Sequence, residues 1–148
     1  MTDLRFEVGG TQFQVRVHLL HVREDHLLVV TVPDSTFWFL PGGTLQTGET
    51  LSEAAAREWR EETGTEATAL HLAGIVEGFD RPGHRQQLGF CFLVEAWGLP
   101  TGAFPVRDEP TLRAEWVPLA ELEARPVHPV GLRALLDRQE IQLWQTEW

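Results

Sequence analysis

Three amino acids are missing from this chain. It contains no lysine, no asparagine and no tyrosine, and all twelve of its basic residues are arginine. The absence of lysine excludes a lysine nucleophile and the lysine of a P-loop, and the absence of tyrosine excludes a tyrosine general acid. The codons of these amino acids are rich in A and T, so we expect the gene to come from a GC-rich, bacterial genome.

Cysteine and long apolar stretches are also scarce. Cys91 is the single cysteine, which excludes an intrachain disulfide and a zinc cluster built on thiolates. Its place between Phe90 and Phe92 indicates a buried, unreactive thiol. The longest apolar runs, such as Leu27–Val30, are too short to span a bilayer, and residues 1–7 lack the features of a signal peptide. We therefore expect a soluble, cytoplasmic protein that does not enter a membrane.

Positive charge is in short supply. The chain has 22 acidic and 12 basic residues, a formal net charge of -10. Such a surface repels a polyphosphate backbone, which argues against nucleic acid as a partner. An anionic small molecule would still need positive charge in its binding site, and a bound divalent cation would supply it.

The length and composition indicate one globular domain over residues 1–148. Of the 148 residues, 43% are apolar and 23% are charged, and the chain has no repeat or long linker. Six tryptophans, two of them in the last five residues, favour a covered terminal surface and hence a homodimer.

Alternating apolar residues predict the first strands. Phe13–Leu20 has the period of a half-buried strand, and Leu27–Val32 is expected to be its hairpin partner. Phe37–Leu40 is a short apolar strand that ends at Pro41-Gly42-Gly43. Later strands are expected at Leu70–Phe79, Leu88–Trp97 and Ala114–Val117, with a turn at residues 81–83 and a loop at Pro100–Pro110.

The clearest helix is predicted at Thr50–Thr63. Thr50 and Glu53 match a capping box, and Gly64 stands where a left-handed C-terminal cap belongs. Leu51, Ala55 and Trp59 are spaced to form its buried stripe. Further helices are expected at Pro118–Glu123 and Val130–Arg138, and Ile141–Trp148 is expected to be a strand or a loose tail.

Three carboxylates share one face of this helix. Glu58 lies beside both Glu61 and Glu62, and like charges at these spacings destabilise a helix by roughly 0.2–0.5 kcal/mol per pair. The spacing alone is more often a solvated acidic face. Here Gly42-Gly43 can bring backbone carbonyls close to a metal, and Glu49 can reach back toward the cluster. These neighbours favour a site for a hard divalent cation, which takes oxygen ligands.

At this point the segment from Gly43 to Thr65 resembles the Nudix box. The polar positions fixed in that motif are all present: Gly43, Glu49, Arg57, Glu58, Glu61, Glu62 and Gly64. Trp59 and Thr65 stand where the box has aliphatic residues, so the local packing should differ there. Leu40-Pro41-Gly42 is similar to the usual lead-in, and residues 115–122 are similar to the family's exit from its last strand.

The resemblance implies both a fold and an activity. The fold is α/β: an α/β/α sandwich with a mixed sheet, in which the box forms a loop–helix–loop. The activity is hydrolysis of a diphosphate linkage in a nucleoside diphosphate joined to another group, with Mg²⁺ or Mn²⁺ as cofactor. The partner is thus a small nucleotide derivative, such as a nucleoside triphosphate, a nucleotide sugar or ADP-ribose.

The resemblance also implies roles for single residues. Glu58, Glu61 and Glu62, together with the Gly42 carbonyl, are the expected metal ligands. Glu49 and Arg57 are expected to hold Glu58 in place. For the general base two alternatives stay open, which are a glutamate of the box (Glu58 or Glu61) and an acid of the later loop (Glu109, or its neighbour Asp108).

Several residues and functions are less favoured. His84 and Arg85 could reach a phosphate, but a solvated turn explains them, and Phe79 and Trp97 are expected in the core rather than stacked on a base. A non-catalytic Nudix-fold binding module would be expected to have lost ligands. A prenyl diphosphate isomerase would need a protonating partner, for which Cys91 is badly placed. RNA decapping is disfavoured by the net charge.

Overall fold

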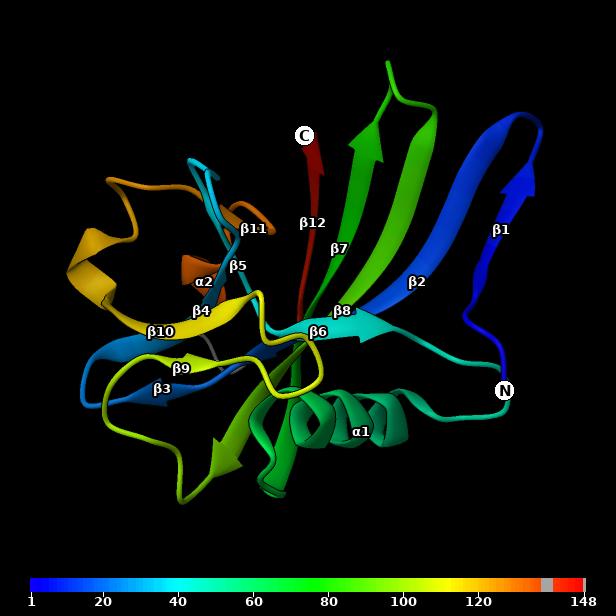
Figure 1. Cartoon of the computed structure of the whole chain (residues 1–148). Coiled ribbons are helices and arrows are strands. Elements are labelled where there is room, and N and C mark those ends of the chain that lie inside the picture. The colour runs from blue at the N-terminus through cyan, green and yellow to red at the C-terminus, as the bar shows by residue number, and fades with distance from the viewer. Residues whose placement is uncertain (137–139, 148) are drawn as a thin grey trace.

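The structure is a computed structural model that describes residues 1–136 and 140–147, and its strands form two mixed sheets (Figure 1). The first sheet has the order β1-β2-β8-β7-β12, and β6 also pairs with β2. Its strands are β1 (Arg5–Val8), β2 (Thr11–Leu20), β8 (Arg85–Ala96), β7 (Ala67–Asp80), β12 (Gln142–Glu147) and β6 (Gly42–Thr44). The pairs β2–β8 and β7–β12 are parallel, and the others are antiparallel.

The second sheet has the order β11-β5-β4-β10-β9, and β3 pairs with β4. Its strands are β11 (Val127–His128), β5 (Trp38–Phe39), β4 (His26–Thr31), β10 (Arg113–Pro118), β9 (Phe104–Pro105) and β3 (Val22–Arg23). The β5 and β6 strands flank Leu40 and Pro41, so one short segment passes from the second sheet to the first.

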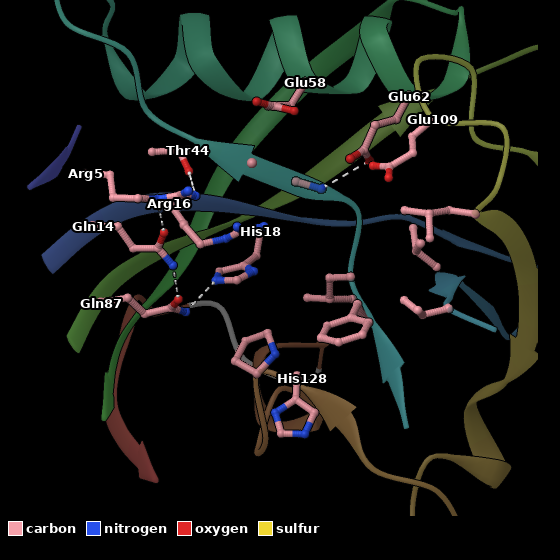
Figure 2. A pocket seen from close by; sticks show the side chains of 18 of the residues that line it. Arg5, Gln14, Arg16, His18, Thr44, Glu58, Glu62, Gln87, Glu109 and His128 are labelled. Atoms are coloured by element: carbon pink, nitrogen blue, oxygen red, sulfur yellow. Dashed lines mark hydrogen bonds between the residues drawn. The ribbon is translucent and has the colours of Figure 1, made fainter. Parts of the chain in front are cut away.

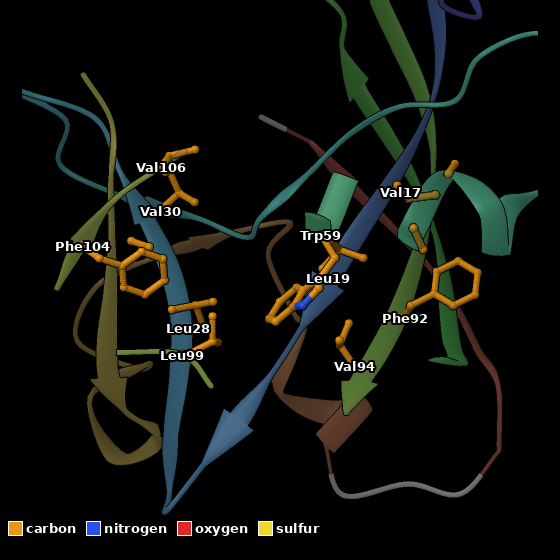
Figure 3. Close-up of a cluster of buried hydrophobic side chains, with 13 residues drawn as sticks. Val17, Leu19, Leu28, Val30, Trp59, Phe92, Val94, Leu99, Phe104 and Val106 are labelled. Atoms are coloured by element: carbon orange, nitrogen blue, oxygen red, sulfur yellow. The ribbon is translucent and has the colours of Figure 1, made fainter. Parts of the chain in front are cut away.

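Helix α1 (Leu51–Thr63) forms with the caps that the sequence predicts. Thr50 and Glu53 make both hydrogen bonds of the capping box, and Gly64 adopts the left-handed conformation with φ 74°. Ala54, Ala55 and Trp59 are fully buried in the core that includes the first sheet, and Figure 3 shows Trp59 there. Their partners include Val17, Leu19, Phe92 and Val94 of β2 and β8.

The opposite face of the first sheet is covered as well. Leu20 and Cys91 point into a second core, where they meet Leu132 and Leu135, the latter in the short helix α2 (Arg133–Leu136). The sheet is therefore enclosed on both sides. The expected α/β class, with a mixed sheet between helix-bearing layers, is confirmed, and a second sheet completes it.

Strand pairing differs from the prediction at β4. This strand is not the hairpin partner of β2; it pairs with the two-residue β3 and along its whole length with β10. The reason is burial, because Leu27–Val30 is buried on both faces and so belongs in the interior of a sheet.

The later helices are shorter than predicted. In place of a helix at Pro118–Glu123 there is one 3-10 turn, η1 (Leu119–Glu121), and the Val130–Arg138 prediction is met only by α2, with residues 137 and 138 outside the described range. The predicted loop at Pro100–Pro110 contains the short strand β9. The choice between strand and tail at the C-terminus is settled as strand β12, apart from Trp148, which is not described. No helix in the described part of the chain is long and apolar enough to cross a membrane.

Candidate active site

A pocket of about 750 Å³ lies between helix α1 and the two sheets (Figure 2). Its walls differ in chemistry. The acidic wall consists of Glu58, Glu62, Asp108 and Glu109. The polar wall includes Arg5, Gln14, Arg16, His18 and Gln87, and the aromatic wall consists of Phe37, Phe39 and His128.

Glu58 is a buried carboxylate at the helix side of the pocket. Its Oε1 accepts a hydrogen bond from Arg57 Nη1 at 2.8 Å, and its carboxylate lies against Gly43 so closely that a Cβ there would collide with it. Burial raises the pKa of Glu58, while Arg57 opposes the rise. Gly43 is therefore required because it leaves room for this carboxylate.

Arg57 connects the carboxylates to the preceding loop. Its guanidinium donates to both carboxylate oxygens of Glu49, at 3.0 and 2.8 Å, and to the Thr44 carbonyl at 3.1 Å. Glu49 in turn accepts from the Gln46 N–H at 2.7 Å. This arrangement fixes the side chain of Arg57, which then holds Glu58, as the box resemblance implies for Glu49 and Arg57.

Glu62 lies one helical turn beyond Glu58. Its Oε2 accepts from the Gly42 N–H at 3.2 Å. Burial raises the pKa of Glu62 to about 8, and repulsion from Glu58 and Asp108 adds to the effect. The acidic side chains here thus outnumber the basic side chains that could neutralise them. Such an excess of negative charge is expected at a cation site.

Glu61 is placed differently from its two neighbours. Its side chain is 44% exposed, pairs with Arg57 Nη1 at 3.2 Å, and is not among the residues that line the pocket. Within residues 1–136 and 140–147, no three His, Cys, Asp or Glu side chains form a cluster that could hold a metal. The structure thus brings together Glu58, Glu62 and the Gly42 backbone. A hard cation that keeps open positions for water and phosphate oxygens still fits such a set.

The later loop joins the site through its backbone. The Arg107 N–H donates to the Glu62 carbonyl at 2.8 Å, which ties the loop to the C-terminal turn of α1. Asp108 and Glu109 line the pocket together with Glu62 (Figure 2). Both candidates for a loop base are therefore present in the pocket.

The structure gives different outcomes for the residues that the sequence left less favoured. Cys91 is fully buried, and burial raises the pKa of its thiol to about 12, so it is inert. His84 is exposed outside the pocket, whereas Arg85 lies at its margin with its guanidinium on Asp80 at 2.6 Å. Trp97 is 82% exposed, so its predicted place in the core is wrong.

Sequence reasoning missed two walls of the pocket. Gln14, Arg16 and His18 form the polar face of β2, which alternation alone presents as a solvent face. On the aromatic wall, the Phe37 ring lies 4.9 Å from Phe39 and 4.6 Å from His128, centroid to centroid. The available signals were the alternation of polar and apolar residues along β2 and, for the aromatic wall, the short apolar run before Pro41.

Known proteins resemble this chain in sequence and in structure. Residues 12–139 match the family model for the NUDIX domain. A MutT-like protein of Streptomyces ambofaciens is 41% identical over 115 residues, which cover 77% of this chain and 70% of that protein. An ADP-ribose pyrophosphatase of Methanocaldococcus jannaschii is 29% identical over 79 residues, 51% of this chain and 47% of that protein.

A solved structure gives the same fold. The crystal structure of a MutT protein from Bacillus halodurans superposes with a TM-score of 0.70 at 23% identity, and covers 91% of this chain and 90% of its own. Among curated relatives, the aligned part spans from 24% to 70% of the relative's length.

Proposed function

The chain belongs to the Nudix family, and on that premise we propose that it is a metal-dependent pyrophosphohydrolase. The substrate is a nucleoside diphosphate joined to a further group. The observation that carries this proposal is the pair of carboxylates, Glu58 and Glu62, which face one pocket in surroundings that raise the pKa of both.

Glu58, Glu62 and the Gly42 carbonyl would hold the cation, and Glu61 would act through water because its side chain points away from the pocket. Mg²⁺ or Mn²⁺ bound there would neutralise the diphosphate and lower the pKa of a bound water. Arg57, fixed by Glu49, orients Glu58. None of these roles requires a cysteine, a lysine or a tyrosine.

Glu109 is our choice for the general base. It lines the same pocket as Glu62, and the hydrogen bond from Arg107 to the helix end ties its loop to the pocket. Glu109 would accept the proton of the water that attacks phosphorus. Asp108 is the alternative from the same loop, and Glu58 is the alternative from the box.

The aromatic wall supports a nucleotide rather than a bare polyphosphate as the substrate. Phe37, Phe39 and His128 offer ring faces and edges on which a base can pack, opposite the acidic wall. Nucleoside triphosphates, nucleotide sugars and ADP-ribose all meet this description. We also propose a homodimer and a cytoplasmic location, with no nucleic acid as partner.

A substrate screen with two substitutions tests the proposal. Nucleoside diphosphate derivatives are incubated with Mg²⁺ or Mn²⁺, and both products are identified. We expect Glu58→Gln and Glu62→Gln each to lower turnover by at least about a hundredfold at saturating metal. Glu66→Gln is the matched control, since Glu66 is exposed and pairs with the exposed Arg60. Near-normal turnover in either site variant would refute the assignment, and binding without turnover in the wild type would favour a binding module.

A further inference from the structure

Arg16 is a cation that lines the pocket. It lies in the middle of β2 between Gln14 and His18 (Figure 2), and it is partly buried. Within the described residues its guanidinium makes no hydrogen bond and no ion pair. Burial lowers the pKa of Arg16, while Glu58 and Glu62 oppose the change. A guanidinium has five N–H donors, and leaving them without acceptors in a partly buried position costs stability unless a ligand supplies the acceptors.

The other polar groups of this wall are already engaged with one another. Arg5 donates to Gln14 Oε1 at 3.1 Å and to Thr44 Oγ1 at 3.3 Å. Gln14 donates to Gln87 Oε1 at 2.9 Å, and the Gln87 amide reaches His18 at 3.5 Å. Arg16 stands in the same row and takes no part in this network. Its donors are therefore the ones left for a ligand.

The neighbouring strands place Arg16 at the pocket and next to the acidic wall. In the sheet register Arg16 lies opposite Thr44 of β6 on one side and Gly89 of β8 on the other. Gly89 has no side chain, and the position that its Cβ would take is occupied by His18 and Val76. The next residues of β6, Gly43 and Gly42, contact Glu58 and Glu62, so Arg16 borders the acidic wall.

We propose that Arg16 binds a phosphate group of the substrate next to the carboxylates. This inference rests on the proposed function and extends it. The planar fork of an arginine matches two phosphate oxygens, and such charge-assisted pairs are stronger than neutral hydrogen bonds. With a cation on one side and Arg16 on the other, a protein of net charge -10 offers a diphosphate positive charge from two directions.

The rival explanation is that Arg16 only compensates the charge of Glu58 and Glu62. The two explanations differ for phosphate. If Arg16 binds phosphate, Arg16→Gln weakens phosphate binding, and the loss of a nearby positive charge leaves Mg²⁺ binding equal or tighter. If Arg16 only compensates the carboxylates, the substitution tightens Mg²⁺ binding and leaves the affinity for phosphate at saturating Mg²⁺ unchanged.

Calorimetric titration of the full chain with inorganic pyrophosphate at saturating Mg²⁺, and with Mg²⁺ alone, separates these cases. We expect Arg16→Gln to weaken pyrophosphate binding about tenfold to a hundredfold, the range for a hydrogen bond to a charged group. Arg16→Lys should recover part of the loss, because it keeps the charge without the fork. Arg60→Gln, the matched loss of one exposed arginine paired with Glu66, should bind like the wild type.

Equal pyrophosphate affinity in Arg16→Gln and the wild type would overturn the proposal, as would a parallel loss of Mg²⁺ binding. Arg16→Lys keeps the test valid if the glutamine variant does not fold, since a lysine that binds as well as the wild-type arginine would exclude a role for the fork. A wild type that binds pyrophosphate through Arg16 but hydrolyses no nucleotide derivative would refute the hydrolase and leave Arg16 as a phosphate ligand.

Discussion

The surroundings of Glu62 in the folded chain disfavour the ionised form of its carboxylate. Its carboxylate accepts one backbone hydrogen bond, from Gly42, and faces the negative charges of Glu58 and Asp108. With a pKa raised to about 8 it carries a proton at neutral pH unless a cation takes that place. Protons and metal ions therefore compete for the same oxygen atoms.

The competition predicts how stability depends on pH. Because the pKa of Glu62 in the folded chain lies above its ordinary value of 4.5, the folded state holds this proton more tightly than the unfolded state does. That contribution to stability is complete below pH 4.5 and is lost as the pH rises to about 8. We expect the Tm gain caused by Mg²⁺ to grow from about pH 6.5 to about pH 8.5, because the cation replaces the proton.

Thermal unfolding with Mg²⁺ or with EDTA measures this gain. His18 does not interfere, since burial lowers its pKa to about 3 and its contribution is lost only as the pH falls below 6.5. Glu62→Gln, which cannot titrate at this position, should show a smaller gain with a weaker dependence on pH, because only Glu58 then competes with the cation. A wild-type gain that stays constant across the range would contradict the expectation.

At the scale of elements, α1 shows which features a sequence can predict. Its start and its end depend on contacts within a few residues, such as Thr50 with Glu53, and both were predicted. Of the predicted buried stripe, Ala55 and Trp59 are fully buried and Leu51 is half-buried. The partner of β4 was not, because Leu27–Val30 looks the same whether it pairs with β2 or with β10, which lies more than eighty residues further along the chain. Pairing between distant segments is decided by the assembled core.

The same distinction applies to the site. The spacing of Glu58, Glu61 and Glu62 predicted one helix face, and the resemblance to the box supplied their roles. Glu58 and Glu62 line the pocket, whereas Glu61 does not. Arg16 was missed because it is a polar residue between Val15 and Val17, and a strand with one face in solvent has the same alternation. Only the later elements β6 and the 106–112 loop turn that face into a pocket wall.

The two departures from the Nudix box compensate each other. Trp59 is fully buried, and its Nε1 donates to Thr65 Oγ1 at 3.1 Å, so the bulky residue and the hydroxyl occur together. We expect Trp59→Leu to lower the free energy of unfolding by about 2–4 kcal/mol through lost packing. Thr65→Val should cost about 1–3 kcal/mol, because it leaves a buried donor without an acceptor.

A double-mutant cycle measured by chemical denaturation checks this coupling. The double variant, which restores the aliphatic pair of the family box, should lose less than the sum of the single losses by about 1 kcal/mol, because removing the tryptophan also removes the unsatisfied donor. Thr68→Val is the control for the loss of a hydroxyl, as Thr68 is exposed and bonds to the Glu95 carbonyl. Simple additivity of the two losses would show that the residues act separately.

Across the whole molecule, the pocket depends on parts that are far apart in the chain. The acidic wall comes from α1 and the 106–112 loop, and the polar wall comes from the first sheet. The aromatic wall comes from β5, from Phe37 just before it, and from β11 of the second sheet. A ligand that contacts all three walls is bound only by the complete fold. Binding should therefore stabilise the two sheets together rather than one of them.

Thermal unfolding with Mg²⁺ and a nucleoside diphosphate together tests this coupling. A ligand at a hundred times its Kd adds about 2.7 kcal/mol, which for a chain of this size raises the Tm by roughly 5–10 °C. We expect one transition, followed by circular dichroism and by the fluorescence of the buried Trp38 and Trp59, which lie in different cores. Glu62→Gln should lose most of the shift, whereas Glu66→Gln should keep it. If the two probes separated into distinct transitions and the ligand moved only one of them, the walls would belong to units that unfold independently.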